Sequence, residues 1–140
     1  AGPLSPQLRA YTSAYRARLA AAIAALAGQP EAVGLRIAAI GYCMGGGAAL
    51  EAARSGADLA AAVSSHGLLE TPQPAGPGAI KARLLVCHGD ADPLVPREHV
   101  LAFWREMDAA GQYTRRKDGR GGRGHAQTLL LETLAAKRGA

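Results

Sequence analysis

Apolar residues recur every three or four positions near the start of the chain. These positions are Leu8, Tyr11, Tyr15, Leu19, Ala22, Ile23 and Leu26. The spacing places them on one face of a helix. Pro3 and Pro6 precede this pattern and Gly28 and Pro30 follow it, as is typical of residues that begin and end helices. We therefore expect a first helix over residues 8–26.

Three short apolar runs follow, each with the length and composition of a strand that is covered on both faces. They span residues 35–40, 59–64 and 84–87. Helical patterns alternate with them over residues 48–55, 97–110 and 126–138. This alternation predicts an α/β fold, with a mostly parallel sheet of three to four strands flanked by helices on both faces.

The remaining segments lack such periodicity. Residues 67–78 are rich in proline and glycine, which predicts a loop. Tyr113 and Thr114 are compatible with the start of a fourth strand, but residues 115–124 are charged and glycine-rich with no apolar alternation. We expect a loop over that charged segment.

Composition indicates one globular domain. Hydrophobic residues make up 49 % of the 140 residues and charged residues 19 %, which is unlike a disordered chain. The chain begins at Ala1 rather than at Met. We expect residues 1–140 to form a single domain that is truncated at its N-terminus.

The sequence also indicates the cellular compartment in which the protein is expected. No apolar run approaches the roughly 18 residues needed to span a membrane, so no membrane partner is expected. Two cysteines, Cys43 and Cys87, are too few for a disulfide framework. Free thiols near the ends of buried strands are typical of intracellular enzymes, and we expect a cytoplasmic protein.

The formal net charge of +5 is concentrated in one stretch. Its basic residues are Arg115, Arg116, Lys117, Arg120 and Arg123. A basic run can bind phosphates, but no aromatic residues interleave with these charges, as they do in single-strand binding surfaces. A solvated loop is the favoured interpretation, and we expect no nucleic-acid partner.

The strongest chemical signal is the segment Gly41-Tyr42-Cys43-Met44-Gly45. Its form, Gly-x-nucleophile-x-Gly between a strand and a helix, is that of a nucleophile elbow. Cys43 would be the nucleophile, and the backbone N–H of Met44 would stabilise a developing oxyanion at the helix N-terminus. A glycine-rich turn with a structural cysteine is the alternative. A dinucleotide-binding turn does not fit, because Cys43 stands where its second glycine is required.

Candidate partners of Cys43 follow in the order acid, then histidine. Asp90 and Asp92 come after the third predicted strand, whose end shares a sheet edge with the end of the Cys43 strand. Either carboxylate could orient a histidine, although Pro93 also makes Asp92 a candidate turn cap. His125 would accept the thiol proton and return it to the leaving group. The order nucleophile, acid, histidine is that of the α/β-hydrolases.

The other three histidines compete for a role. His66 follows the second predicted strand and is a candidate for contacting the substrate. We expect His88 to brace the turn before Gly89, and His99 to be a solvated helix residue. Histidine and cysteine are too dispersed for a recognisable metal site, and we expect neither a metal nor a cofactor.

Three segments together resemble the C-terminal portion of the dienelactone hydrolase family, within the α/β-hydrolases. They are Gly41-Tyr42-Cys43-Met44-Gly45-Gly46, His88-Gly89-Asp90-Ala91-Asp92-Pro93-Leu94-Val95-Pro96, and the Gly-x-x-His run from Gly122 to His125. The resemblance favours Asp92 over Asp90 and implies a catalytic triad of Cys43, Asp92 and His125. It implies hydrolysis of a small-molecule ester or lactone through a thioester-linked acyl-enzyme, without a cofactor.

The resemblance also implies that part of the family's fold is absent. Family members carry several further strands before the first helix, and that part supplies a second oxyanion donor. Losing such a donor costs about 3–4 kcal/mol of transition-state stabilisation, so we predict weak or absent activity for the isolated chain. An exposed central strand would also leave an edge open to self-association. The alternative hypothesis is an inactive fragment that acts as a binding or assembly module.

Overall fold

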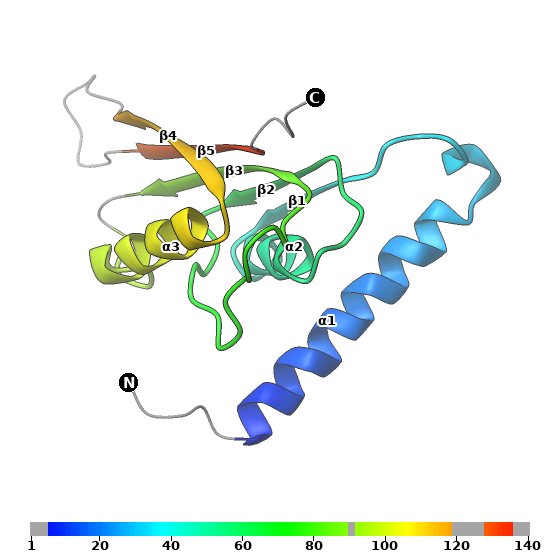
Figure 1. Cartoon of the computed structure of the whole chain (residues 1–140), viewed down its shortest axis with the longest axis horizontal. Helices are drawn as coiled ribbons and strands as arrows, with labels where there is room; N and C mark the ends of the chain where they lie inside the picture. Colours follow the sequence, from blue (N-terminus) through cyan, green and yellow to red (C-terminus); the bar gives the residue numbers. More distant parts are fainter. Residues whose placement is uncertain (1–5, 90–91, 119–127, 136–140) are drawn as a thin grey trace.

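The computed structural model describes residues 6–89, 92–118 and 128–135. Its elements are α1 (Pro6–Ala27), a short 3-10 helix (Pro30–Ala32), β1 (Ala38–Tyr42), α2 (Met44–Arg54), β2 (Ala61–Ser65), β3 (Arg83–Gly89), α3 (Arg97–Ala109), β4 (Gln112–Asp118) and β5 (Thr128–Ala135). Helices precede β1 and follow β1 and β3, whereas a loop joins β2 to β3 (Figure 1). The predicted α/β class is therefore confirmed.

The five strands form one sheet in the order β1-β2-β3-β5-β4. β1, β2 and β3 are parallel, whereas β5 runs antiparallel to both β3 and β4. Within the described residues β1 pairs with β2 alone, so it forms one edge of the sheet. The register places Ile40 beside Val63, and Val63 beside Leu85.

Two predictions for the C-terminal third are wrong. Within the expected helix over residues 126–138, residues 128–135 form the strand β5, and within the expected charged loop over residues 115–124, residues 115–118 belong to the strand β4. The rest of both segments lies outside the described residues. The leucines of β5 fit one face of a helix as well as a strand, and periodicity alone cannot separate the two in a short apolar run. Residues 128–135 form a strand because they pair with β3. This pairing provides hydrogen-bond partners for backbone N–H and C=O groups of β3 that would otherwise lack them.

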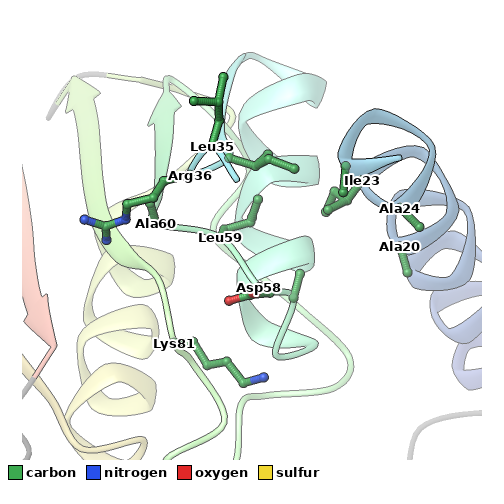
Figure 2. A pocket seen from close by; sticks show the side chains of 12 residues that line it. Ala20, Ile23, Ala24, Leu35, Arg36, Asp58, Leu59, Ala60 and Lys81 are labelled. Atoms are coloured by element: carbon green, nitrogen blue, oxygen red, sulfur yellow. The ribbon is translucent and has the colours of Figure 1, made fainter. Parts of the chain in front are cut away.

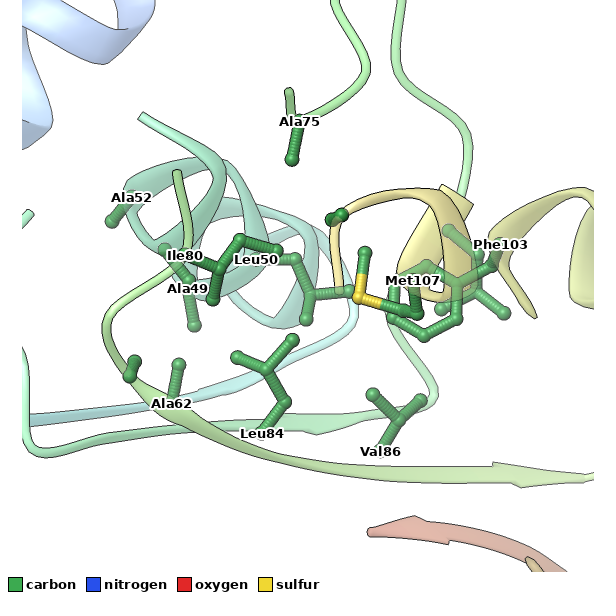
Figure 3. Packing of buried hydrophobic residues seen from close by; sticks show 14 of the residues in the cluster. Ala49, Leu50, Ala52, Ala62, Ala75, Ile80, Leu84, Val86, Phe103 and Met107 are labelled. Carbon is green, nitrogen blue, oxygen red and sulfur yellow. The ribbon is translucent and has the colours of Figure 1, made fainter. Parts of the chain in front are cut away.

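The core lies between the sheet and two helices. Ala62, Leu84 and Val86 extend from one sheet face toward α2 and α3, where Leu50 and Met107 meet them (Figure 3). The α-helices α1, α2 and α3 of the described chain lie on this side (Figure 1). We expected helices on both faces, and the described residues leave the opposite face without one.

A buried ionic cluster joins the helices beneath the sheet. Arg54 donates two hydrogen bonds of 2.8 Å to Glu106 on α3 and one of 2.9 Å to Glu51. Glu51 also accepts a 2.8 Å hydrogen bond from Arg16 on α1. The side chain of Arg54 is only 1 % exposed. The cluster therefore fixes α1, α2 and α3 relative to one another.

Candidate active site

Cys43 is the single residue between β1 and α2. Its backbone has φ 52° and ψ −121°, in a region that non-glycine residues enter at a cost of roughly 1–3 kcal/mol. Its N–H donates to the carbonyl oxygen of Ser65 at 3.0 Å, and its carbonyl oxygen accepts from Gly46 at 3.0 Å. The thiol side chain is exposed. The backbone is thus held from both sides in the strained turn that a nucleophile elbow requires.

Two glycines make this turn possible. A Cβ on Gly41 would overlap the carbonyl group of Gly45, and one on Gly46 would lie 2.6 Å from Ser64 Oγ and 3.0 Å from Gly67 Cα. Around Gly45 a Cβ would meet nothing within 4 Å. Small flanking residues are therefore required, as predicted, but the close contact after Cys43 falls on Gly46 rather than on Gly45.

Met44 is the first residue of α2, and its side chain is 77 % exposed. The N–H groups of a helix's first turn have no acceptor within the helix, and they carry partial positive charge. The Met44 amide therefore lies where a developing negative charge beside Cys43 would be stabilised.

Asp92 follows β3 at the same edge of the sheet, because β1, β2 and β3 run parallel. Its Oδ1 accepts a 2.9 Å hydrogen bond from the backbone N–H of Leu94. Its own N–H donates to the carbonyl oxygen of Gly89 at 3.0 Å. Asp92 therefore caps the turn after β3. The hydrogen bond from Leu94 occupies Oδ1 alone. The second carboxylate oxygen, Oδ2, is therefore compatible with a role in orienting a histidine.

His125, the third member of the predicted triad, and Asp90, the alternative acid, lie outside the described residues. Asp90 and His125 are both in segments that the structure does not describe. The structure thus brings Cys43 and Asp92 to one edge of the sheet, while the position of His125 relative to Cys43 stays a prediction.

The other histidines differ in environment. His66 follows β2 directly beside Cys43, is exposed, and also has a positive φ of 41°. His88 is buried, with 3 % exposure, at the end of β3. His99 was expected to be solvated, but its Nε2 lies 3.0 Å from Oε1 of Glu70 in the loop before β3.

Two cavities of the described chain lie away from Cys43. One of about 580 Å³ separates α1 from the segment that enters β1, with Ile23, Leu35 and Leu59 in its lining (Figure 2). A second, of about 460 Å³, shares residues 35–37 with the first. Both are at the end of β1 opposite Cys43. No cluster of three metal-ligating side chains occurs among the described residues, and no helix among them is long and apolar enough to cross a membrane.

Three parallel strands, with a strained cysteine turn between β1 and α2, define an α/β-hydrolase type of protein. The model of the dienelactone hydrolase family matches residues 4–116. The chain belongs to that family.

Among the solved structures that resemble this chain are two with similar sequences. The protein m3DLH is 45 % identical, with a TM-score of 0.68 over 75 % of this chain and 44 % of its own. P91, a dienelactone hydrolase-like promiscuous phosphotriesterase from metagenomic libraries, is 44 % identical, with a TM-score of 0.61 over 69 % of this chain and 41 % of its own. This chain therefore spans less than half the length of either relative. No curated protein matches it.

Proposed function

We propose that this chain carries hydrolase chemistry for small-molecule esters or lactones, with Cys43 as the nucleophile. The observation that carries the proposal is the conformation of Cys43. A cysteine with φ 52° and an exposed side chain stands at a strand-to-helix junction in a member of the dienelactone hydrolase family. Such strain persists only where the surrounding structure imposes it, and it is concentrated at functional sites.

The reaction proceeds in two steps, acylation of Cys43 and hydrolysis of the resulting thioester. In the first, the Cys43 sulfur attacks the carbonyl carbon, and the Met44 amide stabilises the oxyanion that forms. The carbon–oxygen bond to the leaving group then breaks, the alcohol takes the proton, and a thioester remains on Cys43. In the second, water attacks the thioester, which releases the carboxylic acid and restores the thiol. No redox change occurs, and no cofactor is required.

The remaining roles follow from this sequence of steps. His125 accepts the thiol proton, donates it to the leaving alcohol, and activates the water of the second step. Asp92 orients His125 through its second carboxylate oxygen. His66, exposed beside Cys43, contacts the substrate. The two free cysteines support a reducing, cytoplasmic setting for this chemistry.

Phosphotriester hydrolysis is a second candidate activity. P91 is named as a promiscuous phosphotriesterase and is 44 % identical to this chain. The same exposed thiol could attack phosphorus and expel an alcohol or phenol, with water then cleaving the sulfur–phosphorus bond. The carboxylic ester remains the first substrate to test, because it follows from the family rather than from one member.

Hydrolysis of an activated acetyl ester tests the proposal. The chain is compared with Cys43→Ala and His125→Ala, and Cys87→Ala serves as the matched cysteine control. We expect slow turnover that is lost in the first two variants and retained in the control. Absence of turnover, or a rate unchanged by Cys43→Ala, would support the inactive binding or assembly module instead.

A further inference from the structure

Exposed apolar side chains lie at the edge of the sheet that carries the Cys43 thiol. Met44 follows Cys43 directly and is 77 % exposed. Leu68 and Leu94 are 53 % and 70 % exposed, in the segments that follow β2 and β3. Because β1, β2 and β3 run parallel, these segments share the edge at which the strands end. Single exposed apolar residues are ordinary, whereas a group of them at one site marks a binding surface.

The backbone brings Met44 and Leu68 to the same turn of α2. Gly47 lies three residues after Met44, on the same face of the helix. A Cβ on Gly47 would lie 3.5 Å from the carbonyl oxygen of Leu68 and 3.8 Å from its Cβ. Leu68 therefore packs against the first turn of α2, to which Met44 belongs. Both apolar side chains lie at the helix N-terminus, where the reacting carbonyl group would bind.

The segment that carries Leu68 is held on both sides. Before it, the N–H of His66 donates a 2.9 Å hydrogen bond to the carbonyl oxygen of Cys87. After it, Arg54 donates a 2.6 Å hydrogen bond to the carbonyl oxygen of Leu69, whose side chain is buried. Leu68 is thus exposed between two fixed neighbours. An apolar surface that is already in place binds a ligand without the cost of ordering a loop.

The charges at this edge distinguish between an apolar and an anionic substrate. Residues 41–47, 64–69 and 92–96 form the described part of the edge, and they contain no lysine or arginine. The acidic side chain in these ranges is that of Asp92. A substrate carboxylate would therefore meet a like charge and no basic side chain in this part of the edge. An uncharged substrate is favoured.

We propose that this edge binds uncharged esters with an aliphatic acyl group, and that Met44 and Leu68 contact the acyl chain. The proposal rests on the proposed function and names its substrate class. The acyl group stays bonded to Cys43 through both steps of the reaction, whereas the alcohol leaves in the first. Apolar contacts beside Cys43 therefore hold the acyl chain in the ester and in the thioester. Each methylene group that they remove from water favours binding.

Alkylation by N-alkylmaleimides tests the proposal without requiring ester hydrolysis. The thiol adds to the maleimide double bond, so that a carbon–sulfur bond forms and the proton moves to the neighbouring carbon. The rates at which N-ethylmaleimide and N-hexylmaleimide label Cys43 and Cys87 are measured by mass spectrometry after digestion. We expect the hexyl reagent to label Cys43 at least about fivefold faster than the ethyl reagent, with little difference at Cys87.

Substitutions locate the apolar contact. Met44→Ser and Leu68→Ser should each lower the hexyl-to-ethyl ratio at Cys43 by at least about twofold, because each removes apolar surface. Leu68→Met keeps an apolar side chain and should retain the ratio. Leu35→Ser is the matched control, since Leu35 is 68 % exposed but precedes β1, at the end opposite Cys43. It should leave the ratio unchanged.

Three results would overturn the proposal. They are equal ratios at Cys43 and Cys87, a ratio at Cys43 that Met44→Ser and Leu68→Ser leave unchanged, and faster labelling of Cys43 by N-carboxypentylmaleimide than by N-hexylmaleimide. The last would show that the edge favours an anion. A high hexyl-to-ethyl ratio in a chain that hydrolyses no ester would uphold the apolar site and contradict the proposed hydrolysis alone.

Discussion

The amide N–H of Cys43 donates a hydrogen bond of 3.0 Å to the carbonyl oxygen of Ser65. This bond continues the pairing of β1 and β2 one residue past the end of β1, and so holds Cys43 beside His66. Both residues have a positive φ, 52° for Cys43 and 41° for His66. Strained non-glycine residues are concentrated at functional sites. Two of them at neighbouring strand ends therefore indicate a functional site at this edge of the sheet.

Gly45 and Gly46, which follow Met44, should respond differently to alanine. Gly46→Ala should lower the free energy of unfolding by about 1–3 kcal/mol, because the added Cβ meets Ser64 and Gly67. Gly45→Ala should be neutral or stabilise by up to about 1 kcal/mol, since the site is open and alanine favours a helix. Urea unfolding of both variants measures this. Equal destabilisation would contradict the described packing of the elbow.

Asp92 should show separable structural and catalytic effects. Asp92→Asn keeps an oxygen that can accept the Leu94 hydrogen bond, so its stability should match that of the wild type. Asp92→Ala should lose about 1 kcal/mol, the typical net value of one hydrogen bond. If Asp92 orients His125, kcat on an activated ester should fall at least about tenfold in both variants. Unchanged kcat in Asp92→Asn would leave Asp92 as a turn cap alone.

Arg54 should dominate the stability of the ionic cluster. Arg54→Ala leaves Glu106 buried without its cation and leaves Glu51 with Arg16 alone, and breaking a buried pair in this way costs about 3–5 kcal/mol. Arg105→Ala, on the exposed side of the same helix as Glu106, is the matched control and should stay within about 0.5 kcal/mol of wild type. A loss below about 1 kcal/mol in Arg54→Ala would show that the cluster contributes little.

Tyr15 should make stability depend on alkaline pH. Burial, followed by the nearby Tyr11 and Glu51, raises the pKa of Tyr15 above its ordinary value of 10.0. The folded state therefore favours the neutral phenol, and this contribution is present below pH 10 and lost as pH rises through the folded pKa. Unfolding free energy should fall more steeply above about pH 10 in wild type than in Tyr15→Phe. If unfolding free energy fell equally with pH in wild type and Tyr15→Phe, the raised pKa of Tyr15 would be contradicted.

The sequence predicts the first two-thirds of this fold well, because local signals there agree with the tertiary structure. The predicted helix over residues 48–55 corresponds to α2, which begins four residues earlier and ends one residue earlier, and the predicted helix over residues 97–110 differs from α3 by one residue at its C-terminal end. The predictions for the C-terminal third are wrong for a physical reason. The leucines of β5 have no decisive period, and their pairing with β3 is non-local.

The candidate site was foreseen only in part. The spacing of Gly41, Cys43 and Met44 was sufficient to place the elbow, because a strand followed at once by a helix forces that turn. The contact at Gly46 comes from Gly67 in a distant loop, which sequence spacing does not reveal. The ionic cluster was missed as well, although Glu51 and Arg54 stand out as charges three residues apart in an alanine-rich helix.

The central claim, that Cys43 attacks esters, is tested most directly by locating the acyl group. The chain is incubated briefly with an activated acetyl ester, quenched in acid, and digested, and the acetylated peptides are quantified by mass spectrometry. His125→Ala is run in parallel. We predict acetyl thioester on Cys43, far less on Cys87, and slower labelling of Cys43 in the variant. Equal labelling of the two cysteines, or no label on Cys43, would contradict the account.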